Sequence, residues 1–188
     1  MTDTKIDPST TLTTLNEATE WLAERFDAGV HCPCCGQLVK RYKRKLNSSM
    51  AYVLILLFHR EQYGLAGDAD SFKTIGPYVH VPSYLVWCTR RTPAMAAATR
   101  GDWAKLVHWD LIEAMPGQER EDGSKRAGFY KVTAKGDLFV NNALLVPAHI
   151  YLYNQEVQAQ PDDTQIPMVS IRDALGVKFN YAELMEGL

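Results

Sequence analysis

The residues with the clearest chemical potential are the thiols of one short segment, Cys32-Pro33-Cys34-Cys35-Gly36. Two thiolates two residues apart, here Cys32 and Cys35, can bind one metal ion, while Gly36 lets backbone N–H groups point at the sulfurs and offset their charge. A closed tetrahedral site needs four ligands. The remaining ligands would come from a small set: Cys34, His59, His80 or Cys88. A bound zinc ion and a metal-free turn with free thiols are therefore both open.

The Cys-Pro-x-Cys-Gly pattern resembles one zinc knuckle of a ribbon or rubredoxin-type site. That resemblance implies a second pair of cysteines, but only Cys88 lies outside the segment. No basic region followed by an apolar core begins the chain, and no apolar run approaches the roughly 18 residues of a membrane span, so we expect a cytoplasmic protein without a membrane partner. A disulfide is disfavoured in that compartment.

Positive charge is the second chemical feature, and it is unevenly distributed. The 188 residues include 20 Lys and Arg against 22 Asp and Glu, a net charge of −2 that excludes a uniformly basic coat. Residues 36–60 nevertheless contain six basic and no acidic side chains, whereas residues 1–30 and 154–188 each contain two basic and six acidic ones. The centre of the chain can therefore form an anion-binding surface, or it can simply expose solvated charges.

Catalytic patterns are missing from the sequence. There is no Gly-x-Ser-x-Gly, no phosphate-binding loop ending in Lys-Ser/Thr and no His-Glu-x-x-His, and the five histidines are scattered singly. We therefore do not expect an enzyme.

Hydrophobic periodicity predicts where the helices lie. Residues 15–26 have the spacing of an amphipathic helix that ends before Gly29, and residues 50–63 are apolar on nearly every side, which is typical of a helix inside a core. Asn47-Ser48-Ser49 offers N-cap side chains to the second helix. The basic stretch after the cysteines is expected to be a helical turn, on which Lys40, Lys43 and Arg44 would share a face.

Residues 101–142 resemble the second half of a winged helix-turn-helix domain of the MarR/PadR kind. The resemblance rests on a helix followed by Asp110-Leu111-Ile112-Glu113, a polar hairpin tip, and Val132-Thr133-Ala134-Lys135-Gly136 at the start of the next helix. Asp110 replaces the usual Gly, and Val132 replaces the usual Leu. Asp tolerates the left-handed conformation better than most residues, so the turn can be retained.

The resemblance implies that the helix at 101–109 enters the major groove of duplex DNA and that the wing contacts the backbone. The side chains expected at DNA in this region are Arg90, Arg91, Arg100, Lys105, His108, Arg120, Lys125, Arg126 and Lys131. The basic segment would extend the surface with Lys40, Arg41, Lys43 and Arg44. Glu119, Glu121 and Asp122 in the wing would repel phosphates if they pointed the same way.

These observations predict a mainly α protein with a small β-wing (α+β), in which a winged helix carries an added N-terminal helix and a C-terminal extension. The expected domains are 1–46 (helix, cysteine knuckle and basic segment), 47–154 (winged helix) and 155–188 (acidic extension). The predicted function is DNA binding, as a transcriptional regulator or architectural factor, in a homodimer. The alternative is an interaction protein of the kind found in bacteriophages, which uses the winged helix as a scaffold and binds and blocks a host or phage protein.

Overall fold

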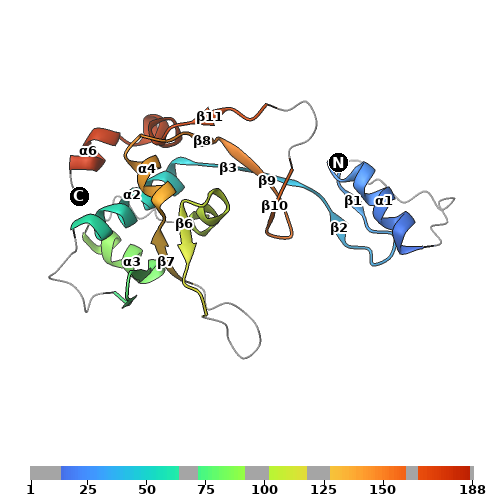
Figure 1. Ribbon diagram of the computed structural model, residues 1–188, viewed down its shortest axis with the longest axis horizontal. Helices are drawn as coiled ribbons and strands as arrows, with labels where there is room; N and C mark the ends of the chain where they lie inside the picture. The colour runs from blue at the N-terminus through green and yellow to red at the C-terminus, as the bar shows by residue number, and fades with distance from the viewer. Residues whose placement is uncertain (1–13, 64–71, 92–101, 118–127, 160–164, 187–188) are drawn as a thin grey trace. The chain divides into compact units, whose positions relative to one another are not determined.

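The computed structural model describes residues 14–63, 72–91, 102–117, 128–159 and 165–186, which divide into two compact units (Figure 1). The first unit contains the described residues of 1–45 and 149–165, and the second contains those of 46–148 and 166–188. The start of the second unit coincides with the expected boundary near residue 46. Residues 155–188, expected as a separate extension, are instead divided between the two units.

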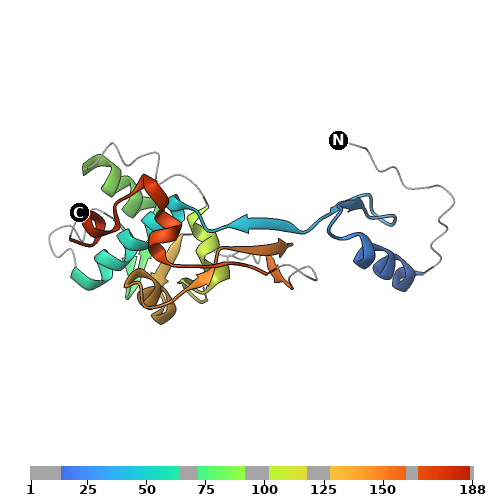
Figure 2. The same ribbon diagram turned by 90° about the horizontal axis from the view of Figure 1, so that it is seen from above.

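Among its described residues, the first unit contains one helix and two small sheets. Helix α1 (Leu15–Arg25) begins with a capping box in which the side chains of Thr14 and Glu17 each accept a hydrogen bond from the other's backbone N–H. A hairpin of β1 (Val30–His31) and β2 (Leu38–Val39) follows. The larger sheet has the order β10-β9-β3, all antiparallel, and Figure 2 shows its strands. Its strands are β3 (Tyr42–Lys45), β9 (His149–Tyr153) and β10 (Glu156–Gln158).

The second unit is built around helix α2 (Ser48–Tyr63). Asn47 Oδ1 accepts a hydrogen bond from Met50 N at 3.0 Å, as the capping prediction required. Every residue from Met50 to Phe58 is buried, so the predicted core helix is confirmed. Helices α4 (Ala134–Val140) and α5 (Ile171–Leu175) contact it. The other helices among the described residues are α3 (Val81–Arg91), the 3₁₀ helices η2 (Trp103–Trp109) and η3 (Gly176–Lys178), and α6 (Tyr181–Glu186).

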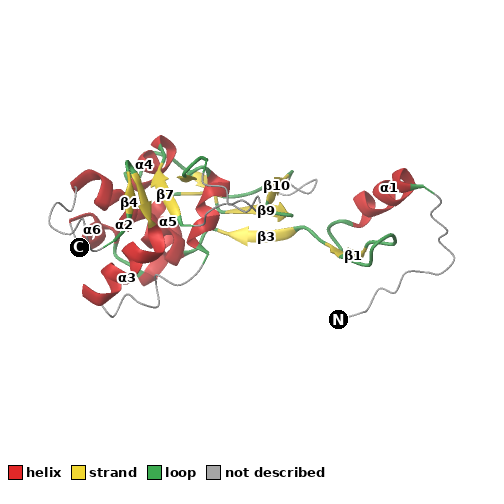
Figure 3. Ribbon diagram, turned by 90° about the horizontal axis from the view of Figure 1, so that it is seen from below, coloured by secondary structure: helices red, strands yellow, loops and turns green. Residues whose placement is uncertain are grey.

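A four-stranded antiparallel sheet of order β4-β5-β7-β6 also belongs to the second unit (Figure 3). Its strands are β4 (Thr74–Ile75), β5 (Tyr78–His80), β7 (Phe129–Val132) and β6 (Ile112–Ala114). A separate pair joins β8 (Val146–Pro147) to β11 (Met168–Val169).

The expected fold class is wrong. The structure is 46% helix and 23% strand, with four small sheets among the described residues, so it is a mixed α/β protein rather than a mainly α protein with a single wing. The error has a physical origin, because several of these strands are only two to five residues long and are stabilised by partners distant in the sequence. Such strands leave little alternation of apolar and polar residues to detect.

Candidate functional site: a cationic strand and a cysteine turn

Strand β3, which we call the cationic strand, contains Tyr42, Lys43, Arg44 and Lys45. It pairs with β9 so that Lys43 lies opposite Tyr151 and Lys45 lies opposite His149. Because side chains alternate between the faces of a sheet, Lys43 and Lys45 share one face and Tyr42 and Arg44 share the other. The expected helical turn is therefore wrong, and Lys43 and Arg44 point in opposite directions.

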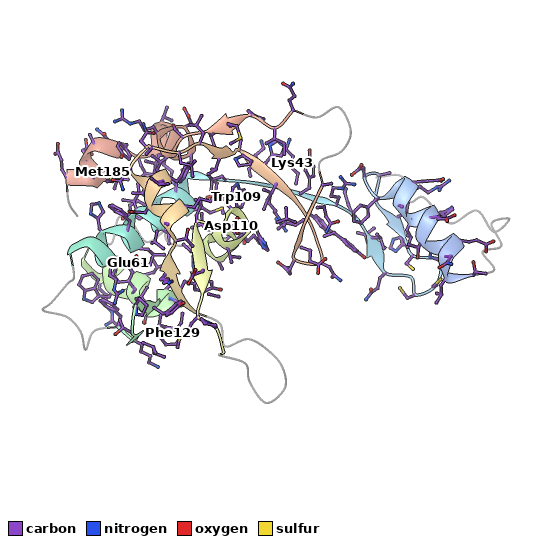
Figure 4. The ribbon with its side chains drawn as sticks, in the orientation of Figure 1. Lys43, Glu61, Trp109, Asp110, Phe129 and Met185 are labelled. Atoms are coloured by element: carbon purple, nitrogen blue, oxygen red, sulfur yellow. The ribbon has the colours of Figure 1, made fainter. Side chains whose placement is uncertain are left out.

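The cations of this strand are free of carboxylates. Lys43 and Lys45 are exposed, and neither they nor Arg44 forms an ion pair with any side chain in the described part of the chain. Their partner strand β9 has no acidic residue. Glu156 lies on β10, opposite Tyr153, two strands from β3 and past the Tyr42 end of that strand, which is the end away from Lys45. Lys43 is labelled in Figure 4.

His149 lies beside these lysines and is unusual for a titratable group. It is only 5% exposed, and its Nε2 atom has no hydrogen-bond partner among the residues that the structure describes. Burial, assisted by the positive charges of Lys43 and Lys45, lowers the pKa of this imidazole below its ordinary value. Burial and the two nearby cations therefore both disfavour protonation of this ring.

Arg41 has a structural role instead. Its Nε atom lies 3.0 Å from Asp27 Oδ1, and its Nη1 atom donates a hydrogen bond to Ala159 O at 2.7 Å. Its guanidinium covers the ring of Phe26 at 5.2 Å, and the Phe26 ring packs edge-on against Tyr153. Arg41 thereby ties the end of α1 to the sheet, whereas Lys40 is half-buried with its aliphatic carbons close to Gly29.

The helix expected to enter the major groove is a 3₁₀ helix, η2, and much of it faces the core. Leu106 and Trp109 are fully buried, and Trp109 Nε1 donates to Pro147 O at 2.7 Å. Asp110, labelled with Trp109 in Figure 4, ends the helix in the left-handed conformation at φ 57°. His108 is half-buried, and burial, followed by the charge of Lys105, lowers its pKa.

Lys105 and Lys131, the described lysines that were expected at DNA in the helix–wing region, are both paired with acids. Lys105 Nζ lies 3.1 Å from Asp102 Oδ2 on η2, and Lys131 Nζ on β7 lies 2.9 Å from Glu113 Oε1 on β6. The same Glu113 oxygen accepts a hydrogen bond from Tyr78 Oη on β5, so three adjacent strands share this network. Arg90 is exposed on α3. Several predicted contacts lie outside the described residues: Arg100, Arg120, Lys125, Arg126 and the side chain of Arg91.

The residues of the winged-helix resemblance form a tight junction. Thr133 caps α4 by accepting from Gly136 N, and its hydroxyl donates to the carbonyl of Asp110. Lys135 Nζ lies 3.4 Å from the Asp110 carboxylate. A Cβ on Gly136 would lie 2.1 Å from the carbonyl oxygen of Leu111, so only glycine allows α4 to approach this closely. These residues therefore hold α4 against the Asp110 turn, and their role is structural rather than the binding of a ligand.

The cysteine turn, Cys32–Gly36, closes the β1–β2 hairpin. Gly36 N donates to Cys32 O at 2.8 Å, Cys32 N donates to Gln37 O at 2.7 Å, and Gly36 has φ 72°. Backbone amides of Cys35 and Cys34 donate hydrogen bonds to the Cys32 thiol, and these bonds lower its pKa below the ordinary value. Cys34 and Cys35 are exposed, and Cys32 is half-buried. Amides directed at a sulfur are the geometry expected of a knuckle that favours thiolate.

The other predicted metal ligands are engaged elsewhere. His59 Nε2 lies 2.7 Å from Leu184 O in the core of the second unit, His80 Nδ1 lies 3.0 Å from Ser83 Oγ, and Cys88 interacts with Tyr84 on α3. No group of three or more His, Cys, Asp or Glu side chains within the described ranges is arranged to hold a metal ion.

In comparisons with known proteins, no protein-family model, curated protein or solved structure matches the chain. None of the helices in the described segments has the length and apolar character that crossing a bilayer requires.

Proposed function

We propose that the protein binds duplex DNA and that the cationic strand β3 is its principal phosphate-contacting surface. The observation that carries this proposal is the pair of exposed lysines, Lys43 and Lys45, on one face of the sheet and without an ion pair among the described residues. Phosphate contacts of this kind supply most of the sequence-independent affinity of proteins for DNA.

The local electrostatics favour an anion at this place. Bringing a phosphate between Lys43 and Lys45 would displace no existing carboxylate partner. It would also counter the positive charges that disfavour protonation of His149. A protonated imidazole donates from both nitrogens, so a nearby phosphate would stabilise the charged form of this ring.

The order of helices and strands in the second unit also supports DNA binding. Buried helix α2, helix α3 near Pro82, helix η2, strands β6 and β7, and helix α4 follow one another in the order on which the winged-helix resemblance rests. Base contacts from this unit would supply the sequence preference that phosphate contacts lack. On helix α3 of this unit, Arg90 is exposed and has no carboxylate partner among the described residues.

The test compares two pairs of lysines. Duplex DNA binding is measured by fluorescence anisotropy from about 50 to 200 mM salt for the wild type, for Lys43→Ala/Lys45→Ala and for Lys105→Ala/Lys131→Ala. Each lost phosphate contact reduces the slope of log affinity against log salt by about 0.9, so we expect the first variant to lose nearly two units of slope and about tenfold or more in affinity.

The second variant removes the same charge from two paired lysines and is the matched control, for which we expect a change of less than about threefold. Equal losses in both variants would contradict the role of the cationic strand. Absence of duplex binding by the wild type at about 50 mM salt would overturn DNA binding altogether.

A further inference from the structure

The cysteine turn has a defined conformation. Its backbone is fixed by hydrogen bonds within the hairpin, and two amides already point at the Cys32 sulfur. His31 Nδ1 lies 2.9 Å from Gly36 O, so this ring also holds the turn together. A Cβ at Gly36 would meet nothing within 4 Å, which leaves open space on that side of the turn. Cys34 and Cys35 are exposed on this turn, and Cys32 is half-buried.

One copy of the turn supplies only part of a zinc site. The Cys-x-x-Cys spacing allows the thiols of Cys32 and Cys35 to bind one ion, and the exposed Cys34 lies between them in the chain. Structural zinc takes four ligands in a closed tetrahedron. Among the described residues no third and fourth ligand join the turn, and His59 and His80 hydrogen-bond elsewhere.

We propose that Cys32 and Cys35 form half of a structural zinc site and that the same two residues of a second copy of this chain complete it. Four thiolates from two identical turns give the tetrahedral sulfur set that zinc prefers. The two copies would be related by a two-fold axis through the ion, because each presents the same surface to the other. Binding converts four thiols to four zinc-bound thiolates and releases four protons to the solvent, with no redox step.

This inference concerns the first unit alone and does not rest on DNA binding. It predicts a stoichiometry that a site within one chain cannot produce, namely one zinc ion for every two chains. It also predicts that the dimer depends on the metal.

The experiment uses the full chain, purified under reducing conditions and then equilibrated with zinc chloride. Zinc per chain is measured by elemental analysis after removal of free metal, and mass is measured by light scattering during size-exclusion chromatography. We expect half an equivalent of zinc in a dimer that becomes a monomer when a chelator removes the ion. One equivalent of zinc in a monomer, a dimer that survives the chelator, or no retained zinc would each overturn the proposal.

Single substitutions identify the ligands. Cys32→Ser and Cys35→Ser should each abolish zinc retention and the dimer, whereas Cys34→Ser and Cys88→Ser are matched thiol deletions that should preserve both. Loss of zinc in Cys34→Ser or Cys88→Ser would place the third ligand within one chain and contradict the shared site. The wild-type protein loaded with cobalt gives a further readout that needs no variant. The intensity of its sulfur-to-cobalt absorption reports four thiolates per ion if the site is shared and two if it is not.

Discussion

The cationic strand and the helix–wing region of the second unit both contain described lysines, but these lysines have different surroundings. Lys43 and Lys45 face solvent without an acidic partner among the described residues, whereas Lys105 and Lys131 are held by Asp102 and Glu113. The difference follows from the neighbours: β9 offers β3 only His, Ile, Tyr and Leu, while β6 places Glu113 directly opposite Lys131. A count of charges along a segment therefore does not predict which of them remain available to a ligand.

The largest expected effect tests whether the motif residues of the helix–wing region determine its shape rather than its charge. In Gly136→Ala, the added methyl carbon would lie only 2.1 Å from the carbonyl oxygen of Leu111. Because that oxygen is backbone, the clash can be relieved only by moving α4 from the Asp110 turn. We expect a loss of about 3 kcal/mol in the free energy of unfolding, measured by urea denaturation.

Ala134→Gly at the start of the same helix is the matched control for this change, since it alters helix propensity without creating a contact; its cost should be about 1 kcal/mol or less. A Gly136→Ala protein as stable as the wild type would mean that α4 does not approach Leu111 this closely.

The next expected effect is a pH dependence of the protein's stability, which arises from His149 beside the cationic strand. Burial, then Lys43 and Lys45, keep the pKa of His149 below the value of about 6.5 that an unfolded histidine shows. The unfolded chain therefore binds a proton more readily, so His149 contributes stability fully above about pH 6.5, and this contribution is lost as the pH falls through the folded-state pKa. We expect acid destabilisation over that range, reduced in His149→Gln.

His80 and His108 have pKa values lowered in the same direction, so a smaller slope should remain in His149→Gln. NMR titration of the imidazole measures the group directly: Lys45→Gln should raise the pKa of His149, and bound DNA should raise it as well if phosphates reach the strand. A His149 that titrates at or above 6.5 without DNA would contradict its burial between two lysines.

Sequence patterns predicted the two helices at 15–26 and 50–63 but missed the cationic strand, for a physical reason. Residues 15–26 and 50–63 contain their own periodic signal, since a helix forms hydrogen bonds within itself, and both helices are present. Residues 42–45 read Tyr-Lys-Arg-Lys, which has no apolar alternation. They become a strand because β9, more than 100 residues later, pairs with them. No local pattern specifies that contact.

The candidate site was partly accessible from sequence. The acid-free run that contains Lys43 and Lys45 was visible as a charge bias, but its face required the strand geometry. The pairing of Lys105 with Asp102, three residues earlier, could have been recognised from spacing alone. The pairing of Lys131 with Glu113 could not, because the two residues meet only once β6 and β7 are in register.

The smallest expected effect comes from releasing a paired lysine, Lys131, from its carboxylate partner. Glu113→Gln removes the charge that holds Lys131 but leaves an amide oxygen for the Tyr78 hydroxyl. Both side chains are partly exposed, so the loss of stability should be below about 1 kcal/mol. If pairing is what keeps Lys131 from phosphates, this variant should bind duplex DNA about two- to threefold more tightly, and its salt slope should rise by about one.

The hydrogen bond to Glu113 also raises the pKa of Tyr78, so this pKa should fall in the variant, which ultraviolet titration would detect. Glu186→Gln changes the net charge equally at an exposed position of α6 and serves as the control. If the two variants gain the same affinity, the gain reflects net charge alone. Lys131 would then lie away from the DNA whether or not it is paired, and the wing would contribute through its shape.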